Sequence, residues 1–377
     1  MNKIRVIITG ANGFIGKNLA LRLSELSEFS AVPFGRYDDV ARLPELLANA
    51  DAVVHLAGEN RPKDESDFYE VNAGLTRSLC EAICAEYEKT ERKISLILSS
   101  SAQAAFDNPY GISKRAAEEA VAHLADKTEC PVAIYRLPGV FGKWCKPNYN
   151  SVVATFCHNI ARDLPIQIND PDALLRLVYI DDVVSAVIKF LSAPAEGACY
   201  REIEPQYNIT IGKLAERIRD FENCRGPLIT ERVGDGLLRA LYATYISYLP
   251  PDRFSYSLPQ HGDDRGVFVE MLKTHDSGQF SFFSAHPGVT RGGHYHHTKT
   301  EKFLVVKGQA LFRFRHLITD EVVELATSSE KPVVVDTIPG WAHDITNIGD
   351  SEMIVMLWAN EIFDREQPDT IAARVAG

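Results

Sequence analysis

The stretch Gly10-Ala-Asn-Gly13-Phe-Ile-Gly16 decides the fold of the first half of this 377-residue chain. It follows a short β-branched apolar run, 3–9, and precedes a helical pattern that begins at Lys17. The first glycine allows a tight turn, the second lets the backbone approach a pyrophosphate, and the third lets a helix pack closely on a strand. Amide groups at the N-terminus of such a helix also favour anions. A strand, a glycine turn and a helix in this order predict a dinucleotide-binding unit.

Strands and helices alternate after this turn, which is typical of a doubly wound parallel sheet of the Rossmann type. The second strand, 31–35, is followed by Arg36. In NAD-binding proteins of this fold, an acidic residue at the end of this strand often binds the adenosine ribose. An arginine there can bind a 2′-phosphate, which favours NADPH over NADH; the alternative is a solvated surface arginine. The later strand 51–58 ends in small residues that let a cofactor lie against the backbone. His55 within it is interpreted as a packed core histidine.

A tyrosine and a lysine four residues apart, Tyr110 and Lys114, open a later helix, after a strand that ends in Ser99-Ser-Ser101. Residues at this spacing share one helical face. The ammonium group can therefore lower the pKa of the phenol until it exchanges protons near neutral pH. A serine at the strand end can hydrogen-bond the reacting oxygen. The pair alone is also compatible with two surface side chains of a helix that have no catalytic role. The glycine turn upstream favours the catalytic interpretation.

The second half begins at Pro250-Pro251, where helical periodicity is lost. From Arg265 onward, short β runs separated by glycine, proline and aspartate predict an all-β sandwich or barrel. A chain of this length also exceeds what one hydrophobic core usually supports. We therefore expect two domains, 1–248 and 249–377.

Two histidines and a glutamate in the second half lie at metal-ligand spacing. His294 and His296 point to the same face of an extended strand, and Glu301 follows on the next apolar run. His343 is a candidate for the fourth ligand. Neutral imidazoles with one carboxylate suit Zn²⁺ or another divalent ion, whereas the alternative reading is a set of satisfied core histidines.

The net charge and the cysteine content indicate which classes of binding partner and which cellular compartment to expect. A net charge of -11 disfavours nucleic acid and anionic membranes, because both attract basic surfaces. The seven cysteines are odd in number and contain no Cys-x-x-Cys pair, which is typical of reduced thiols in a cytoplasmic protein. No apolar run approaches the ~18 residues of a membrane span, and we expect no signal peptide. A small-molecule partner is therefore expected.

The glycine turn, His55-Leu-Ala-Gly58, Asn72, the serine run and Tyr110-x-x-x-Lys114 together resemble the extended short-chain dehydrogenase/reductase family over residues 1–245. The resemblance implies that the tyrosine is the acid/base and that the lysine assists it at the nicotinamide ribose. It also implies that a serine orients the substrate, with Ser101 as the preferred candidate and Ser100 as the alternative. The cofactor contacts that it implies are Gly10, Gly13, Phe14, Ile15, Gly16, Arg36, Leu56, Ala57, Gly58, Asn72, Tyr110 and Lys114.

The polar and aromatic loop that follows residue 137 is a second expected ligand site, because such loops often carry function. In extended members of the family this region binds a nucleotide-diphosphate sugar. The resemblance therefore implies that Lys143 and Lys146 meet the pyrophosphate, and a simple surface loop is the alternative.

The second half resembles the cupin family. Gly288, His294-x-His296, Glu301 and Gly308 match the first cupin motif in spacing, and Pro339-Gly-x-x-His343 resembles the second motif with one residue missing. The resemblance implies a jelly roll with a metal at His294, His296, Glu301 and His343. Arg291-Gly-Gly-His294 also resembles the sugar-nucleotide epimerases related to deoxythymidine-diphosphate-4-dehydrorhamnose epimerase, in which that histidine is a general base. His294 therefore has two competing roles, and its neighbours favour the metal.

A reductase domain followed by a cupin resembles the bifunctional enzymes of capsular-polysaccharide biosynthesis. This implies a cytoplasmic homodimer that takes a UDP-linked 2-acetamido-2,6-dideoxy-4-hexulose. The cupin would epimerise C3, and the first domain would reduce C4 with NADPH. The product would be UDP-N-acetyl-6-deoxy-L-talosamine, on the route to UDP-N-acetyl-L-fucosamine. The alternative is a UDP-4-ketosugar reductase whose cupin is a non-catalytic, metal-stabilised module for dimerisation or substrate capture.

Overall fold

The computed structural model describes residues 3–62 and 64–375, and the chain divides into two compact units. The first unit comprises Met1–Ile218 and Ala240–Leu249, and the second comprises Arg219–Arg239 and Pro250–Gly377. The segment Arg219–Arg239, which the sequence assigns to the first domain, thus groups with the second. The outermost residues of the two expected domains, 1–2 and 376–377, lie outside the described residues.

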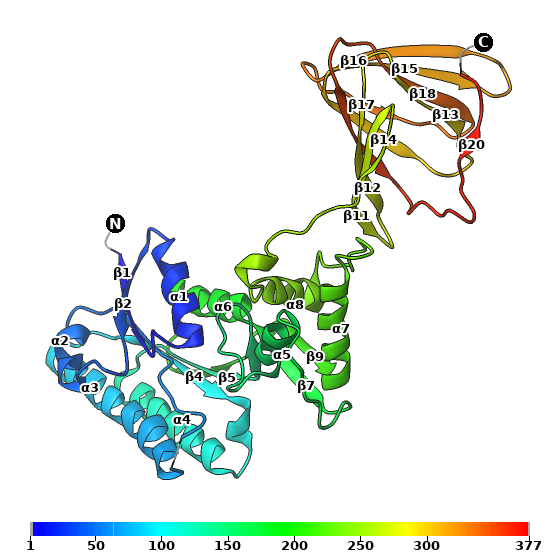
Figure 1. Cartoon of the computed structure of the whole chain (residues 1–377). Helices are drawn as coiled ribbons and strands as arrows, with labels where there is room; N and C mark the ends of the chain where they lie inside the picture. Colours follow the sequence, from blue (N-terminus) through cyan, green and yellow to red (C-terminus); the bar gives the residue numbers. More distant parts are fainter. Residues whose placement is uncertain (1–2, 63, 376–377) are drawn as a thin grey trace. The chain divides into compact units, whose positions relative to one another are not determined.

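The first unit is built on a six-stranded parallel sheet with the order β2-β1-β3-β4-β5-β8 (Figure 1). Alternate side chains of one strand enter different cores: Val6 and Ile8 pack with α1 and α6, whereas Ile7 packs with α2, α3 and α4. Burial on both faces explains why the strands read as continuous apolar runs. The doubly wound α/β prediction is confirmed. The strands are β1 Ile4–Thr9, β2 Phe29–Phe34, β3 Ala52–His55, β4 Ser95–Ser101, β5 Val132–Leu137 and β8 Ala198–Arg201. The helices are α1 Phe14–Ser24, α2 Leu43–Leu47, α3 Leu75–Thr90, α4 Pro109–Thr128 and α6 Ile180–Ser192.

A small three-stranded sheet, β6-β7-β9, belongs to the same unit. β6 runs parallel to β7, and β9 runs antiparallel to it. The loop between β6 and the next helix, α5, contains both lysines that the sequence assigns to the substrate. The elements are β6 Gly139–Phe141, β7 Leu174–Tyr179, β9 Gln206–Thr210 and α5 Val152–Ile160. The helices α7 Ile211–Asn223 and α8 Gly236–Ile246 each have one end in the segment that groups with the second unit. The short 3₁₀ helices of the chain are Val40–Arg42, Ala102–Ala105 and Pro251–Arg253.

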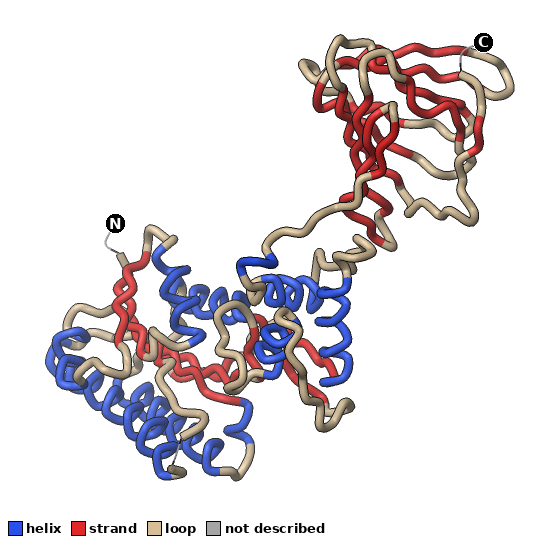
Figure 2. The backbone as a smooth tube through the Cα atoms, viewed as in Figure 1, coloured by secondary structure: helices blue, strands red, loops and turns tan. Residues whose placement is uncertain are grey.

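From β10 onward, all regular elements among the described residues are strands (Figure 2). They form two antiparallel sheets with the orders β10-β11-β12-β19-β14-β17 and β16-β15-β18-β13-β20. The core contains Phe283 and Phe303 from the first sheet and Phe312 and Ile345 from the second, so the sheets pack face to face. The predicted all-β half is confirmed. Its strands are β10 His261–Asp263, β11 Gly266–Thr274, β12 Gly278–Ala285, β13 Thr290–Tyr295, β14 Glu301–Lys307, β15 Gln309–His316, β16 Val322–Ser328, β17 Val334–Asp336, β18 Trp341–Asn347, β19 Met353–Ala359 and β20 Ile371–Ala372.

Candidate functional site

The glycine turn has the close backbone contacts that its sequence predicts. Gly10 has φ +67°, and a Cβ there would lie 2.8 Å from the backbone nitrogen of Ala57. A Cβ on Gly16 would lie 2.4 Å from the carbonyl oxygen of Gly10. Helix α1 starts after Gly13, and no side chain caps its first turn. The amides at Phe14 and the following residues are therefore available to an anion such as a pyrophosphate.

His55 is part of the core, as predicted. Its Nδ1 lies 2.6 Å from Thr9 Oγ1, and its Nε2 lies 2.9 Å from Thr76 Oγ1. Burial lowers the pKa of His55 to about 3. The ring is therefore neutral and has hydrogen-bond partners on both sides, which fixes the end of β3 beside the glycine turn.

The Tyr110/Lys114 pair lies in the first half of α4, next to the end of β4. The Lys114 ammonium group donates a 2.7 Å hydrogen bond to the Ser99 carbonyl oxygen. Burial lowers the pKa of Lys114 to about 8, although the nearby Glu118 carboxylate opposes this shift. Burial raises the pKa of Tyr110, and a hydrogen bond with the Ser101 side chain opposes that shift. In this arrangement the Lys114 ammonium group is turned to the Ser99 carbonyl oxygen, and its effect on the pKa of the phenol stays a prediction.

The structure separates the two candidate serines. The Ser101 side chain hydrogen-bonds Tyr110 and accepts a 3.2 Å hydrogen bond from the Gln103 amide. The Ser100 hydroxyl is buried and donates to Glu118, a carboxylate that also binds Arg136 through two hydrogen bonds of 3.0 and 2.6 Å. Ser101 thus lies beside the phenol, whereas Ser100 binds the buried Glu118 carboxylate of an ion pair.

Asn72 lies in a π-helical segment, Phe68–Gly74, and joins the end of β3 to α4. Its side-chain oxygen accepts the Glu59 amide at 2.9 Å. Its side-chain nitrogen donates to the Glu59 carbonyl oxygen and to the Ser113 hydroxyl, each at 3.0 Å. Both amide protons of Asn72 are therefore used within the protein, so this residue can support a cofactor by positioning Glu59 and the helix that carries Lys114.

Arg36 is exposed but paired. Its side chain is 71% exposed, and its Nη2 lies 2.7 Å from Glu59 Oε2. The Glu59 side chain is 15% exposed and also accepts the amides of Asn60 and Arg61 at 3.1 Å each. Because a guanidinium group has five donors, this ion pair leaves Arg36 able to bind a second anion.

The two lysines of the loop after β6 are held by different partners. Lys143 Nζ lies 2.6 Å from Asp181 Oδ1, so its charge is balanced within the protein. Lys146 Nζ lies 5.1 Å from the ring centroid of Tyr149, within cation–π range. The structure thus places both in the expected loop, with Lys146 free of an ion pair among the described residues.

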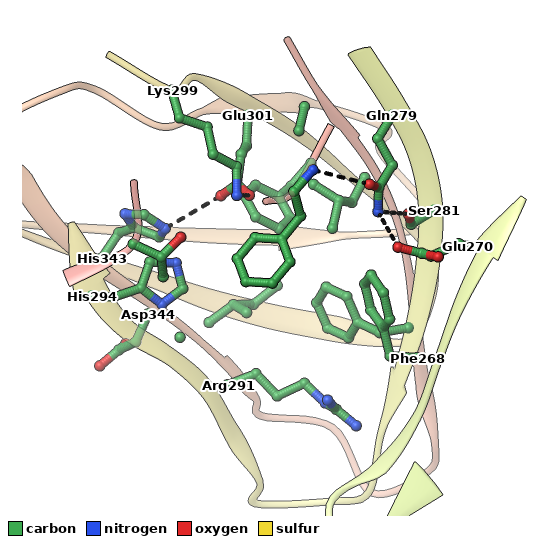
Figure 3. A pocket seen from close by; sticks show the side chains of 18 of the residues that line it. Phe268, Glu270, Gln279, Ser281, Arg291, His294, Lys299, Glu301, His343 and Asp344 are labelled. Atoms are coloured by element: carbon green, nitrogen blue, oxygen red, sulfur yellow. Dashed lines mark hydrogen bonds and ion pairs between the residues drawn. The ribbon is translucent and has the colours of Figure 1, made fainter. Parts of the chain in front are cut away.

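Four ligand atoms converge in the second unit, as the spacing predicts. Atoms of His294, His296, Glu301 and His343 all lie within 4.8 Å of one another. β13 and β18 are paired so that His294 lies directly opposite His343. Glu301 Oε2 lies 3.2 Å from His296 Nε2. It lies 3.6 Å from His343 Nε2, and Figure 3 marks this second interaction with a dashed line. Neighbouring strands of both sheets thus bring the four residues together.

The chemistry of this cluster fits a divalent metal ion. Both ring nitrogens of His343 are buried without a hydrogen-bond partner in the described part of the chain. Burial, followed by the proximity of His343, lowers the pKa of His294 to about 4, so that ring is neutral. Burial raises the pKa of Glu301, but His296 at 3.2 Å and His343 at 3.6 Å lower it by more, so the group is a carboxylate. Three imidazoles and one carboxylate are ligands that Zn²⁺ accepts.

Asp369 supports the cluster and was not predicted from its sequence position. Its carboxylate accepts the amides of His297, Thr298 and Lys299, each at 2.8 Å. Its carbonyl oxygen meets Nδ1 of His296. A histidine that donates one nitrogen to a carbonyl presents the other to a metal. The segment that ends in β20 therefore fixes the turn that carries the ligands.

A cavity of about 320 Å³ adjoins the cluster. Its wall includes Phe268, Phe283 and Phe312, so most of its surface is apolar. Arg291 also lines it: two of its guanidinium nitrogens are buried without a hydrogen-bond partner among the described residues, and the group lies 5.4 Å from the ring centroid of Phe283. Figure 3 shows Arg291, Glu270 and Lys299 around the same space as His294, Glu301 and His343. The cavity can hold a small, partly apolar ligand against the cluster.

Comparisons with known proteins agree with this two-part architecture. The NAD dependent epimerase/dehydratase family matches residues 6–210, and the polysaccharide biosynthesis C-terminal domain matches residues 261–371. No helix in the described residues combines the length and the apolar character that a membrane crossing requires.

The chain is similar over nearly its whole length to a known reductase and to solved structures of CapF. The UDP-2-acetamido-2,6-beta-L-arabino-hexul-4-ose reductase of Pseudomonas aeruginosa is 56% identical over 99% of both chains. The crystal structure of capsular polysaccharide assembling protein CapF from Staphylococcus aureus has a TM-score of 0.90 at 40% identity and covers 100% of both chains. A structure of CapF with the inhibitor 3-isopropenyl-tropolone has a TM-score of 0.84 at 37% identity, over 98% of this chain and 100% of that one. The expected likeness to capsular-polysaccharide enzymes is confirmed. The chain belongs to the NAD dependent epimerase/dehydratase family and carries a polysaccharide biosynthesis C-terminal domain as its second half.

Proposed function

We propose that the chain is a bifunctional UDP-sugar enzyme. The second unit epimerises C3 of a UDP-2-acetamido-2,6-dideoxy-4-hexulose, and the first unit reduces C4 with NADPH to give UDP-N-acetyl-6-deoxy-L-talosamine. The observation that carries the reductase half is the Tyr110–Ser101 hydrogen bond beside buried Lys114, close to the glycine turn. The name of the 56% identical Pseudomonas reductase supports the same reaction class and a UDP-4-ketosugar substrate.

The reductase chemistry assigns a role to each residue of the first site. NADPH supplies a hydride to C4 when it is bound. Tyr110 donates its phenol proton to the C4 oxygen as that oxygen becomes an alkoxide, so the ketone gains one hydride and one proton. Ser101 hydrogen-bonds the same oxygen and orients it. Lys114, held by the Ser99 carbonyl oxygen, places positive charge near the phenolate that remains.

The cofactor and substrate contacts follow from the same placement. The pyrophosphate lies at the glycine turn, and Arg36 binds the 2′-phosphate while its pairing with Glu59 keeps it in position. Lys146, together with Lys143 once it exchanges Asp181 for a phosphate, binds the diphosphate of the sugar nucleotide. The remaining cofactor contacts are Gly10, Gly13, Phe14, Ile15, Gly16, Leu56, Ala57, Gly58, Tyr110 and Lys114, with Asn72 acting through Glu59.

The epimerase half takes place in the cavity of the second unit. A 4-ketone acidifies the proton on C3, so a base removes that proton to give an enolate, and a proton returns on the opposite face. The residues that would hold Zn²⁺ or another divalent ion are His294, His296, Glu301 and His343. Such an ion would polarise an oxygen of the substrate or stabilise the fold. The convergence of all four ligand atoms supports His294 as a ligand rather than as the base.

The cellular setting follows from the cysteines and the resemblance. All seven cysteines are free, which supports a reducing, cytoplasmic compartment. A homodimer is the assembly that the resemblance to the capsular enzymes implies.

Product analysis by NMR tests this proposal. The full chain is incubated with NADPH and the UDP-4-hexulose, with and without a chelator. We expect NADPH oxidation and a product inverted at C3 and reduced at C4, and we expect chelation to abolish the inversion. Reduction without inversion would support a reductase with a non-catalytic second unit. An absence of NADPH oxidation would contradict both readings.

A further inference from the structure

Glu59 occupies a fixed position between the two ligand sites of the first unit. It follows Gly58 at the end of β3, and both its amide and its carbonyl oxygen are bound by the Asn72 side chain. The same Asn72 binds Ser113, the neighbour of Lys114 on α4. The backbone of Glu59 is therefore held in register with the catalytic helix, so only its side chain is free to respond to a ligand.

The carboxylate of Glu59 joins two segments that are far apart in sequence. Oε2 lies 2.7 Å from Arg36 Nη2, at the end of β2. Oε1 accepts the hydroxyl of Tyr149, in the loop after β6, at 3.3 Å. Burial raises the pKa of Glu59, but hydrogen bonds from the Arg61 amide and Arg36 lower it by more, so the group is ionised near neutral pH. The largely buried carboxylate of Glu59 thus links Arg36 of the expected cofactor site to Tyr149 of the expected substrate loop.

Tyr149 is also the aromatic contact of the substrate loop. Lys146 Nζ lies 5.1 Å and Arg61 Cζ 6.0 Å from its ring centroid. The loop backbone is constrained, since Trp144 and Asn148 have φ +68° and +53°. A change in the position of the Tyr149 ring therefore moves the cation that the loop presents to a diphosphate.

Competition for Arg36 supplies the link between the sites. A 2′-phosphate that binds Arg36 shares the guanidinium group with Glu59 and weakens that ion pair. The carboxylate then has less positive charge to satisfy it, so its hydrogen bond from the Tyr149 hydroxyl becomes stronger. A stronger bond fixes the loop in the arrangement that places Lys146 beside Tyr149.

We propose that Glu59 couples the two ligand sites, so that a 2′-phosphate at Arg36 raises the affinity of the substrate loop for a uridine diphosphate through Tyr149. The inference rests on the proposed function, which places NADPH at Arg36 and the UDP moiety at this loop. Because binding couplings are reciprocal, UDP raises the affinity for NADPH by the same factor. NADH has no 2′-phosphate and lacks this effect.

Calorimetric titration of UDP into the full-length protein tests the coupling. Titrations are carried out at saturating NADPH and at saturating NADH, with the wild type and with Tyr149→Phe, Glu59→Gln and Tyr37→Phe. We expect the wild-type Kd for UDP to be about fivefold lower with NADPH than with NADH, at the low end of usual coupling factors. The difference disappears in Tyr149→Phe and Glu59→Gln. Tyr37→Phe, whose side chain is 97% exposed next to Arg36, retains it.

The outcomes separate the inference from the function on which it rests. Equal UDP affinities with the two cofactors in the wild type, or an unchanged difference in Tyr149→Phe, overturn the coupling and leave the reductase proposal standing. Failure of the wild type to bind NADPH at all overturns both. Tyr149→Phe removes a single hydroxyl from a part-buried ring, so it provides the decisive variant if Glu59→Gln does not fold.

Discussion

The site in the first unit and the cluster in the second satisfy their polar groups in opposite ways. Lys114 donates to the Ser99 carbonyl oxygen, and both amide protons of Asn72 are bound by the protein. In the second unit, His343 has two buried ring nitrogens without a hydrogen-bond partner among the described residues. Buried polar groups without partners are costly. The first site is thus organised by the protein's own hydrogen bonds, whereas the second leaves buried ring nitrogens that a bound ion would satisfy.

The sharpest test of the self-contained site is Tyr110→Phe. The variant keeps the ring but removes the proton donor, so we expect the rate of NADPH oxidation to fall by about 10²–10⁴-fold. Absorbance at the NADPH band measures the rate, and circular dichroism and NADPH binding check that the fold and the cofactor site persist. Tyr135→Phe is the matched control, because its hydroxyl binds the Ala186 carbonyl oxygen outside the site. A Tyr110→Phe rate near that of the control would rule out the assigned acid.

Removing the metal tests the other side of the comparison. An ion that binds only the native state and is present at about 1,000 times its Kd adds about 4 kcal/mol to the free energy of unfolding. We therefore expect chelation to lower the unfolding temperature of the second unit while NADPH binding to the first persists. Differential scanning calorimetry with and without added Zn²⁺ measures this. An unfolding profile that is indifferent to both chelator and Zn²⁺ would mean that the four residues form no ion site.

Asp369→Asn probes the support of the cluster rather than its ligands. The substitution removes the charge that accepts the amides of His297, Thr298 and Lys299. We expect the affinity for Zn²⁺ to fall about 10–100-fold, as for other supporting residues of metal sites. Competition with a chromophoric chelator gives the affinity. Asp364→Asn is the control, since Asp364 accepts amides of its own turn, at 2.8 and 3.4 Å. Equal affinities in the two variants would refute the supporting role.

The smallest effect concerns pH. Burial lowers the pKa of Lys114 to about 8, so the ammonium group is lost as the pH rises through that value. We expect the rate of reduction to be about half its maximum near pH 8 and to fall further above it. Glu118→Gln should shift this decrease in rate to lower pH, because the Glu118 carboxylate raises the pKa of Lys114. A pH–rate profile that stays flat to pH 10 would show that the charge of Lys114 is not needed.

The stability of the fold should depend on the ionisation of Lys114 in the opposite direction to activity as the pH rises. The folded pKa of Lys114 lies below its usual value of 10.5. Between pH 8 and 10.5 the unfolded chain therefore binds more protons than the folded one. The contribution of Lys114 to stability rises with pH in this window, while the activity that depends on its charge falls.

Local sequence patterns predicted much of both units. The glycine turn identified the parallel sheet, and the alternation of His294 and His296 with the later Glu301 and His343 identified the cluster. These features depend on the short-range periods of strands and helices. The same patterns could not place Ser101 rather than Ser100 beside Tyr110, because only the pairing of β4 with its neighbours and the packing of α4 decide that.

Long-range contacts account for what sequence reasoning missed. Asp369 reaches amides about 70 positions earlier because β20 pairs with β13. The ion pair between Arg36 and Glu59 likewise joins the ends of β2 and β3, which the sheet order brings to one edge. Neither contact leaves a periodic pattern in the sequence. Both became evident only from the tertiary structure.

The central claim is that epimerisation and reduction belong to different units of one chain. Deuterium incorporation at C3 tests it most directly, using full-length Tyr110→Phe and His296→Gln in D₂O with the UDP-4-hexulose and NADPH. The account predicts that Tyr110→Phe incorporates deuterium at C3 without oxidising NADPH, and that His296→Gln incorporates none. An absence of deuterium in Tyr110→Phe with its metal bound would contradict the account and leave the second unit without a catalytic role.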